Sequence, residues 1–388
     1  MPLKITREDI ELIQEIGEGS YGKVYQARIK STGAIIAVKS IPLERDDNLW
    51  EIDQEVQFLE KCEHENVIKF YGRLTVRETA VPECWLITEF CGAGAVSDVM
   101  VTAERVLSER EVAYVMRESL KGLDYLHKKH IIHRDIKGNN ILLTMDGELK
   151  LCDFGVSGAV AKTMGKRFTM IGTPYWMAPE VINETGHTIM ADIWSMGIVA
   201  IELAQGCPPY SNKSPSVALM KIGTLKRPPT FNSPGKHSEI FRDFVSKCLK
   251  LDPKERLRCG DLLKHPFLTQ PLPRSLMTEL IAVAAKKAEE ADETEGPIGA
   301  GTAAFAGAAL TVQKDHIATF GADDASTIAR DSVTSGSSEF ASGDSGTIVV
   351  KKVEGGAFGR ADSDTVVRDS KKKGKAKGDK GGDDCDVQ

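Results

Sequence analysis

The chain has 388 residues, and its 41% hydrophobic content can build one large core or two lobes with an extension. Its 50 Lys and Arg residues against 56 Asp and Glu residues give a net charge of -6, which excludes the globally basic field typical of nucleic-acid-binding proteins. The eight cysteines contain no C-x-x-C pair, and we find neither an apolar signal segment nor the ~20 apolar residues that a membrane span needs. We therefore expect a cytoplasmic protein with free thiols, no membrane span and no nucleic-acid partner.

A glycine-rich turn near the N-terminus separates two segments of alternating polarity. Residues 10–16 alternate, residues 17–22 are Gly-Glu-Gly-Ser-Tyr-Gly, and the alternation resumes from Val24. This pattern predicts a strand, a turn and a second strand. Without a Cβ, glycines allow the backbone to lie against phosphate groups. A helix after the turn would favour a dinucleotide-binding fold instead, so the strand that follows makes this alternative the weaker one.

The next apolar strand ends at Lys39. A lysine at a strand end is usually solvated, so a binding role depends on a carboxylate that holds it in place. A helix is predicted over 49–62 from its apolar spacing, and it offers Glu55 as the best partner. Glu51 and Glu60 are the alternatives.

Two further strands, over 67–72 and 85–90, are predicted to complete a small sheet. The polar segment 75–84 joins them. A long helix follows over 109–127, where apolar residues recur at helical spacing.

The residues with the most chemistry lie after this helix. Residues 133–140 are His-Arg-Asp-Ile-Lys-Gly-Asn-Asn, and residues 153–155 are Asp-Phe-Gly. Short apolar strands over 141–143 and 149–151 are predicted to lie between the two motifs. The carboxylates, the amide and the lysine offer a proton acceptor, hard oxygen ligands and a cation within one short stretch.

Both motifs resemble the catalytic loop and metal-binding turn of eukaryotic protein kinases, H-R-D-x-K-x-x-N and D-F-G. Residues 17–22, Cys-Gly-Ala-Gly-Ala-Val-Ser-Asp at 91–98 and Gly-Thr-Pro-Tyr-Trp-Met-Ala-Pro-Glu at 172–180 are similar to sterile-20-like kinases of the germinal-centre group, especially the Hippo-type mammalian branch. The similarity covers roughly residues 8–270.

The resemblance implies an α+β, bilobal protein-kinase fold. The N-lobe, over 8–91, would be a small β-sheet with one helix, and the C-lobe, over 92–270, would be larger and mainly helical. A helical extension is expected over 271–295. Because residues 296–388 are rich in Gly, Ala, Ser and Asp and poor in aromatic residues, we expect a mostly disordered regulatory tail there.

The resemblance also implies an ATP- and Mg²⁺-dependent serine/threonine kinase that acts on protein substrates in intracellular signalling. Asp135 would accept the proton of the substrate hydroxyl, Lys137 would lie beside the γ-phosphate, and Asn140 and Asp153 would bind Mg²⁺. The remaining nucleotide-binding positions that it implies are Gly17, Glu18, Gly19, Ser20, Gly22, Val24, Ala37, Lys39 with Glu55, Glu89, Cys91 and Leu142.

Three further roles follow from the resemblance. Thr88 corresponds to the gatekeeper ahead of the hinge. Asp192 would anchor the backbone of the catalytic loop. Glu180 would pair with Arg256, because a buried carboxylate needs such a partner.

Thr169 is the predicted activation site. Arg134, directly before Asp135, needs an anion, yet residues 156–177 contain three basic residues and no acidic one. Phosphate on Thr169 would supply the missing charge. The position also matches the activating threonine of sterile-20-like kinases, and Thr163 is the alternative.

The tail offers two weaker signals. Thr327, Thr347 and Thr365 each precede an apolar residue, a pattern that loosely resembles the phosphothreonine sites to which Hippo-type kinases recruit an adaptor. The basic run 371–377 is either a nuclear-entry signal or a solvated segment. The sustained heptads of a SARAH coiled coil are missing, so the oligomeric state stays open. A pseudokinase scaffold is the rival function, and the presence of every catalytic residue type disfavours it.

Overall fold

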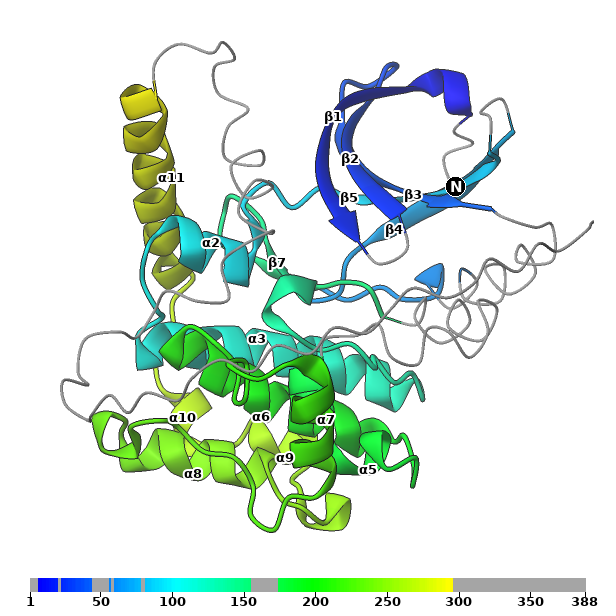
Figure 1. The fold of residues 1–388 in the computed structure, drawn as a ribbon. Coiled ribbons are helices and arrows are strands. Elements are labelled where there is room, and N and C mark those ends of the chain that lie inside the picture. Colours follow the sequence, from blue (N-terminus) through cyan, green and yellow to red (C-terminus); the bar gives the residue numbers. More distant parts are fainter. Residues whose placement is uncertain are drawn as a thin grey trace, which may run out of the picture. The chain divides into compact units, whose positions relative to one another are not determined.

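The computed structural model describes residues 6–19, 22–43, 56, 59–77, 81–154 and 174–295. Within them an antiparallel sheet is followed by a mainly helical part, which confirms the predicted α+β architecture (Figure 1). Glu55, the proposed phosphosite Thr169 and the tail from residue 296 lie outside the described residues. In the part of the chain that is described, no helix combines the length and apolar character needed to cross a membrane.

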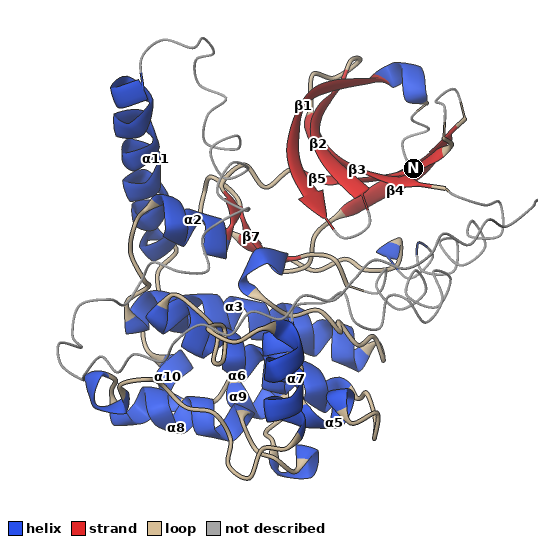
Figure 2. Cartoon of the chain, viewed as in Figure 1, coloured by secondary structure: helices blue, strands red, loops and turns tan. Residues whose placement is uncertain are grey.

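Five strands form the N-terminal sheet in the order β1-β2-β3-β5-β4, with every neighbouring pair antiparallel (Figure 2). Alternate side chains, such as those of Ile36, Val38 and Ile87, are buried on one face, because successive residues of a strand point to opposite sides. The strands are β1 (Ile10–Gly19), β2 (Gly22–Ile29), β3 (Ile35–Pro42), β4 (Phe70–Val76) and β5 (Glu83–Glu89).

The fourth strand begins later than the sequence predicts. Residues 67–72 were the expected strand, but β4 covers Phe70–Val76 and pairs with β5 through Thr75 and Val76. This pairing shortens the expected 75–84 connection. Val67 instead forms a parallel bridge with Leu151 of the C-terminal half, and Ile68 donates its N–H to the Leu151 carbonyl at 2.8 Å. Residues 67–68 thus pair with Leu151, whereas the residues from Phe70 onward pair with β5.

The third glycine of the glycine-rich turn has a packing role. Gly22 has a φ of 150°, and a Cβ at this position would lie 1.9 Å from the carbonyl oxygen of Ser40 on β3. Only glycine allows β2 to begin so close to its neighbour. Gly22 therefore shapes the sheet, whatever its part in phosphate binding.

A second, three-stranded sheet and the helices make up the C-terminal half. The helix predicted over 109–127 is α3, Glu109–Lys128, and a capping box between Ser108 and Glu111 starts it. The predicted strands 141–143 and 149–151 are β7 and β8. The other elements are β6 (Gly94–Ala95), α2 (Val96–Thr102), α5 (Pro179–Ile182), α6 (Ile189–Gln205), α7 (Pro215–Gly223), α8 (Glu239–Cys248), α9 (Cys259–Leu262), α10 (Pro266–Thr269) and α11 (Ser275–Glu295), with one-turn 3₁₀ segments at Arg7–Asp9, Gly138–Asn140, Pro174–Trp176, Pro234–Lys236 and Pro253–Glu255.

The helix predicted over 49–62 is described only in part. Val56 and Leu59 are helical and buried, and the N–H of Glu60 donates to the Val56 carbonyl at 2.9 Å. Both apolar side chains pack in a cluster with Phe154 and with Leu126 of α3. This cluster joins the N-terminal sheet to the catalytic region.

The C-terminal helix α11 packs on α2 and α3 (Figure 1), as the sequence predicts for its apolar stripe. The predicted stripe of Leu276, Leu280 and Val283 is wrong in part, because Val283 is 41% exposed. The buried face consists of Met277, Leu280, Ile281, Ala284 and Ala288. Helical spacing allows either face, and contact with α2 and α3 selects this one.

Leu280→Ala should lower the free energy of unfolding by about 2–5 kcal/mol, since Leu280 is fully buried and its loss leaves a cavity. Val283→Ala, one turn away and exposed, should change it by less than about 0.5 kcal/mol. Urea denaturation of both variants measures the difference. Equal effects would contradict the orientation of α11.

Candidate active site

Asp192 anchors the catalytic loop, as predicted. Its side chain is 1% exposed and lies in the first turn of α6, where it accepts the N–H groups of His133 and Arg134, each at 2.9 Å. His127 Nε2 lies 2.8 Å from Asp192 Oδ2. Burial by itself would raise the pKa of Asp192, but these hydrogen bonds hold the pKa below its ordinary value. The anchored loop places Arg134 at a φ of 72°, a strained conformation for a residue with a Cβ.

Three predicted catalytic residues meet directly after this anchor. Lys137 Nζ donates to Asp135 Oδ2 at 2.9 Å. Asn140 Nδ2 donates to the same oxygen at 2.8 Å and to the Asp135 carbonyl at 2.7 Å. Among the described residues, Asp135 Oδ1 accepts no hydrogen bond, which leaves it available to a substrate hydroxyl. The donors on Asn140 Nδ2 also leave its Oδ1 available as a metal ligand.

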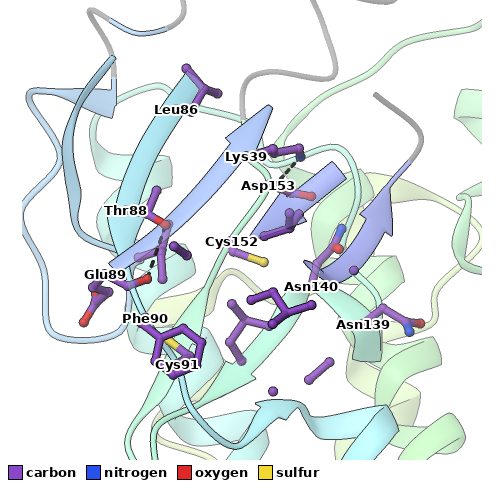
Figure 3. Close-up of a pocket in the computed structure, with 18 of the residues that line it drawn as sticks. Lys39, Leu86, Thr88, Glu89, Phe90, Cys91, Asn139, Asn140, Cys152 and Asp153 are labelled. Carbon is purple, nitrogen blue, oxygen red and sulfur yellow. Dashed lines mark hydrogen bonds and ion pairs between the residues drawn. The ribbon is translucent and has the colours of Figure 1, made fainter. Parts of the chain in front are cut away.

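Asp153 lies across from Lys39, and the two side chains are 2.7 Å apart (Figure 3). Burial would raise the pKa of Asp153, but the charge and hydrogen bond of Lys39, together with Lys137 and His133, outweigh burial and lower it. The carboxylate is therefore ionised at neutral pH. Asp153 has a φ of 59°, and the next residue, Phe154, is 1% exposed and packs inward near the His133 ring. This turn directs the carboxylate toward Lys39 and buries the phenyl ring.

A cavity of about 250 Å³ lies between the N-terminal sheet and β7, and Figure 3 shows its lining. Its apolar walls suit a flat aromatic ring, and Lys39, Asn140 and Asp153 supply polar groups at one end. The predicted nucleotide-binding residues that line it are Gly17, Val24, Ala37, Lys39, Glu89, Cys91, Asn140, Leu142 and Asp153. Thr88, the predicted gatekeeper, lines it as well.

Other predicted residues stand beside the cavity or outside the described residues. Glu18 and Gly19 pair with Lys23 and Gly22 at the turn between β1 and β2, without lining the cavity. Asp135 and Lys137 lie next to Asn140, beyond the cavity lining. The predictions for Ser20 and Glu55 concern residues that the structure does not describe.

Glu89 lines the cavity, and its side chain is held by two neighbouring lysine residues. Its Oε1 accepts the Lys69 N–H at 2.6 Å, and its Oε2 lies 3.4 Å from Lys150 Nζ. The Glu89 carbonyl accepts a 3.3 Å hydrogen bond from the Thr88 hydroxyl. The side chain thus holds the hinge to neighbouring elements, and the Glu89 N–H adds a 2.9 Å hydrogen bond to the Lys69 carbonyl.

Both cavity cysteines are poor nucleophiles. Burial raises the pKa of Cys91 to about 12, and burial also raises the pKa of Cys152 well above its ordinary value. With these raised pKa values, neither thiol ionises at neutral pH. Because the thiolate is the reactive form of cysteine, both side chains are poor nucleophiles. Cys152 therefore packs as a small apolar group at the back of the cavity.

Asp98 was missed by the reasoning from sequence. It lies in the first turn of α2 and lines the cavity, where burial raises its pKa to about 6. Among the described residues Asp98 makes no ion pair, so its carboxyl group is available to a ligand in the cavity. The raised pKa means that this group changes its ionisation close to neutral pH. Asp98 is the last residue of the Cys-Gly-Ala-Gly-Ala-Val-Ser-Asp motif at 91–98, and this motif was the available signal.

The Ala-Pro-Glu segment, which follows residues that the structure does not describe, is fixed to the C-terminal half. Arg256 Nη2 donates to Glu180 Oε2 at 2.8 Å, and Arg256 is only 3% exposed. The Arg256 guanidinium also lies 5.0 Å from the centre of the Trp194 ring. The predicted Glu180–Arg256 pair is thereby confirmed.

A family model described as "Protein kinase domain" matches residues 10–268 of this chain. The chain belongs to the protein kinase family. It therefore contains the domain of a phosphotransferase, with the small N-lobe sheet and helical C-lobe typical of that family. Helix α11 of this kinase lies beyond the matched residues.

The kinase offers oxygen ligands that fit Mg²⁺, the metal that protein kinases generally use with ATP. Asn140 supplies an amide oxygen and Asp153 an ionised carboxylate. In the described part of the chain, no group of three or more His, Cys, Asp or Glu side chains would hold a metal by itself. Mg²⁺ suits such a site, because it is held by one or two carboxylates together with substrate phosphates and water. When bound, it would neutralise charge on the phosphates.

Proposed function

We propose that the chain is an ATP- and Mg²⁺-dependent serine/threonine kinase of the sterile-20-like type that phosphorylates proteins in intracellular signalling. The observation that carries this proposal is the arrangement of Asp135 with Lys137 and Asn140, opposite the Lys39–Asp153 pair. Asp135 keeps one oxygen for a substrate hydroxyl, and the two lysines are placed to neutralise phosphate charge.

The acceptor specificity rests on Lys137. A lysine two residues after the catalytic aspartate is the serine/threonine pattern, and its ammonium contacts Asp135 directly at 2.9 Å. The motifs at 91–98 and 172–180 support the sterile-20-like assignment. A pseudokinase scaffold is disfavoured because the four groups needed for transfer are all present, with Asn140 bonded to Asp135 and Lys39 paired with Asp153.

Incubation of the purified protein with γ-labelled ATP, Mg²⁺ and a peptide library containing Ser, Thr and Tyr acceptors tests the proposal. We expect label on Ser and Thr, with none when Mg²⁺ is chelated. Label confined to Tyr would contradict the acceptor class. Nucleotide binding without any transfer would favour the scaffold.

Activation by phosphate on Thr169 is part of the proposal. Arg134 is exposed and makes no ion pair among the described residues, although Asp192 holds its backbone at the catalytic loop. A phosphate with close to two negative charges would pair with this fixed cation and order the segment.

Thr169→Ala should lower kcat by at least about tenfold, the scale of one lost charge-assisted hydrogen bond. Phosphatase treatment of the wild type should have the same effect, and Thr163→Ala, at the alternative site, should leave turnover unchanged. The measurement is steady-state turnover with the phosphorylation state verified by mass spectrometry. Full activity in protein without phosphate at Thr169 would refute this activation site.

We also propose that Thr327, Thr347 and Thr365 are phosphorylated and act as docking sites for a phosphothreonine-reading adaptor. Their apolar following residues are the supporting feature. We further propose that the protein is cytoplasmic and that the basic run 371–377 allows it to enter the nucleus. Absence of phosphate at these three threonines in an active preparation would refute the adaptor sites, and imaging of a variant with the basic run neutralised tests nuclear entry.

A further inference from the structure

A basic segment without any acidic residue lies in the C-terminal half. Acidic residues outnumber basic ones in the whole chain, yet residues 206–238 contain no Asp or Glu. Their basic residues, all described and all exposed, are Lys213, Lys221, Lys226, Arg227 and Lys236. Among the described residues none of these side chains forms an ion pair. The segment therefore carries positive charge that the described part of the chain leaves unneutralised.

Helix α7, Pro215–Gly223, presents apolar side chains between these cations. Met220 is 64% exposed, more than any other large apolar side chain in the described part of the chain, and Val217, one turn earlier, is also exposed. Lys221 lies on the same side, because residues three and four apart are neighbours on a helix. The opposite side is buried through Ala218 and Ile222. One face of α7 thus combines an apolar pair with a lysine.

Both ends of α7 are held by residues on either side of Ala-Pro-Glu. Tyr175 Oη donates to the Lys213 carbonyl at 2.7 Å, ahead of the helix. Asn183 Nδ2 donates to the Gly223 carbonyl at 2.9 Å, at its end. The helix also packs on α5 and on the Pro174–Trp176 turn. The exposed face of α7 is therefore fixed relative to the segment that would carry the peptide.

We propose that the α7 surface, made of Val217 and Met220 with Lys213, Lys221, Lys226 and Arg227, is a docking site for protein substrates. The docked part would be an acidic segment with a bulky apolar residue, separate from the phosphorylated hydroxyl. The inference rests on the proposed function, in which the substrate is a protein.

The chemistry of the α7 surface selects this kind of segment. Its unpaired cations attract carboxylates and repel basic segments. An apolar side chain that covers Met220 and Val217 would remove apolar surface from water. The net charge of -6 on the whole chain disfavours nucleic acid, a larger polyanion that would also meet the acidic remainder of the surface.

The first measurement compares two forms of one acceptor peptide, the best substrate from the peptide library. One form is unextended, and the other carries Asp and Glu residues around one Leu, joined by a flexible Gly-Ser linker at either end. We expect the acidic extension, at one of the two ends, to lower KM about tenfold with kcat unchanged, since docking raises the effective concentration of the acceptor. The gain should shrink at high salt, because the cations are exposed.

The second measurement repeats this comparison in variants of the α7 surface at matched phosphorylation. Lys226→Glu with Arg227→Glu should abolish the gain, and Met220→Ala should reduce it about threefold. The double variant should instead favour an extension of Lys residues around Leu, which gives no gain in the wild type. KM for ATP and kcat/KM for the unextended peptide should stay within about twofold, because none of these residues lines the nucleotide cavity.

Two exposed residues elsewhere in the C-terminal half provide matched controls. Lys254→Glu reverses a charge that has no ion pair among the described residues, and Ile240→Ala removes an apolar side chain that is 51% exposed on α8. Both should keep the full gain from the acidic extension. All of these substitutions are at exposed positions, so melting temperatures should stay close to the wild-type value.

The outcomes separate the two proposals. An active wild type without any gain from the acidic extension, or a gain that survives Lys226→Glu with Arg227→Glu, would overturn the docking site alone. An acidic segment that crosslinks to α7 without lowering KM would point to a regulatory partner and would also overturn substrate docking. A wild type that phosphorylates neither form of the peptide would overturn the proposed function.

Discussion

Asp135→Asn is expected to lower the rate of phosphoryl transfer by about a thousandfold, within the range for loss of a general base. The amide cannot take a proton from the substrate hydroxyl. Its oxygen can still accept the hydrogen bonds that Lys137 and Asn140 donate to Asp135 Oδ2. Loop geometry and nucleotide affinity should therefore stay near the wild-type values.

Single-turnover kinetics with saturating nucleotide measure this effect directly. Asp146→Asn is the matched control, because Asp146 is exposed in the turn between β7 and β8. It should leave turnover unchanged. A purified Asp135→Asn protein with near-normal turnover would refute the role of Asp135 as the proton acceptor.

Asp153→Ala is expected to abolish most activity and, unlike Asp135→Asn, to weaken nucleotide binding as well. The change removes an ionised oxygen ligand and also leaves Lys39 without the carboxylate that lies 2.7 Å away. A loss of at least about a thousandfold in kcat/KM follows if both the metal and the phosphates are misplaced.

Calorimetric titration with ATP, in Mg²⁺ and in EDTA, tests this assignment. Wild-type affinity should depend strongly on Mg²⁺, and in Asp153→Ala the two conditions should give nearly the same affinity. Asp135→Asn is the comparison, because it should keep the Mg²⁺ dependence. An unchanged Mg²⁺ dependence in Asp153→Ala would show that another group holds the metal.

Local sequence patterns were sufficient to predict the α+β architecture and to select the candidate catalytic groups. Helix α3 and the strands β7 and β8 each have a clear local apolar pattern, and tertiary contacts do not change their bounds. The predicted bounds were therefore nearly correct. Asp135, Asn140 and Asp153 are recognisable because their spacing around β7 and β8 is short and fixed. Local pattern is sufficient where the interacting residues are close in the chain.

Features that depend on residues far apart in the chain could be read only from the folded structure. The bounds of β4 follow from pairing with β5 and from the bridge between Val67 and Leu151. The buried face of α11 follows from its contact with α2 and α3, since helical spacing also allowed Val283. Glu202 of α6 accepts hydrogen bonds from the Gly138 N–H, 64 residues away, and from Trp176 Nε1, 26 residues away, and no periodicity connects these residues. Such contacts depend on how helices and strands pack. The burial of the Glu202 carboxylate could therefore not be explained from the sequence alone.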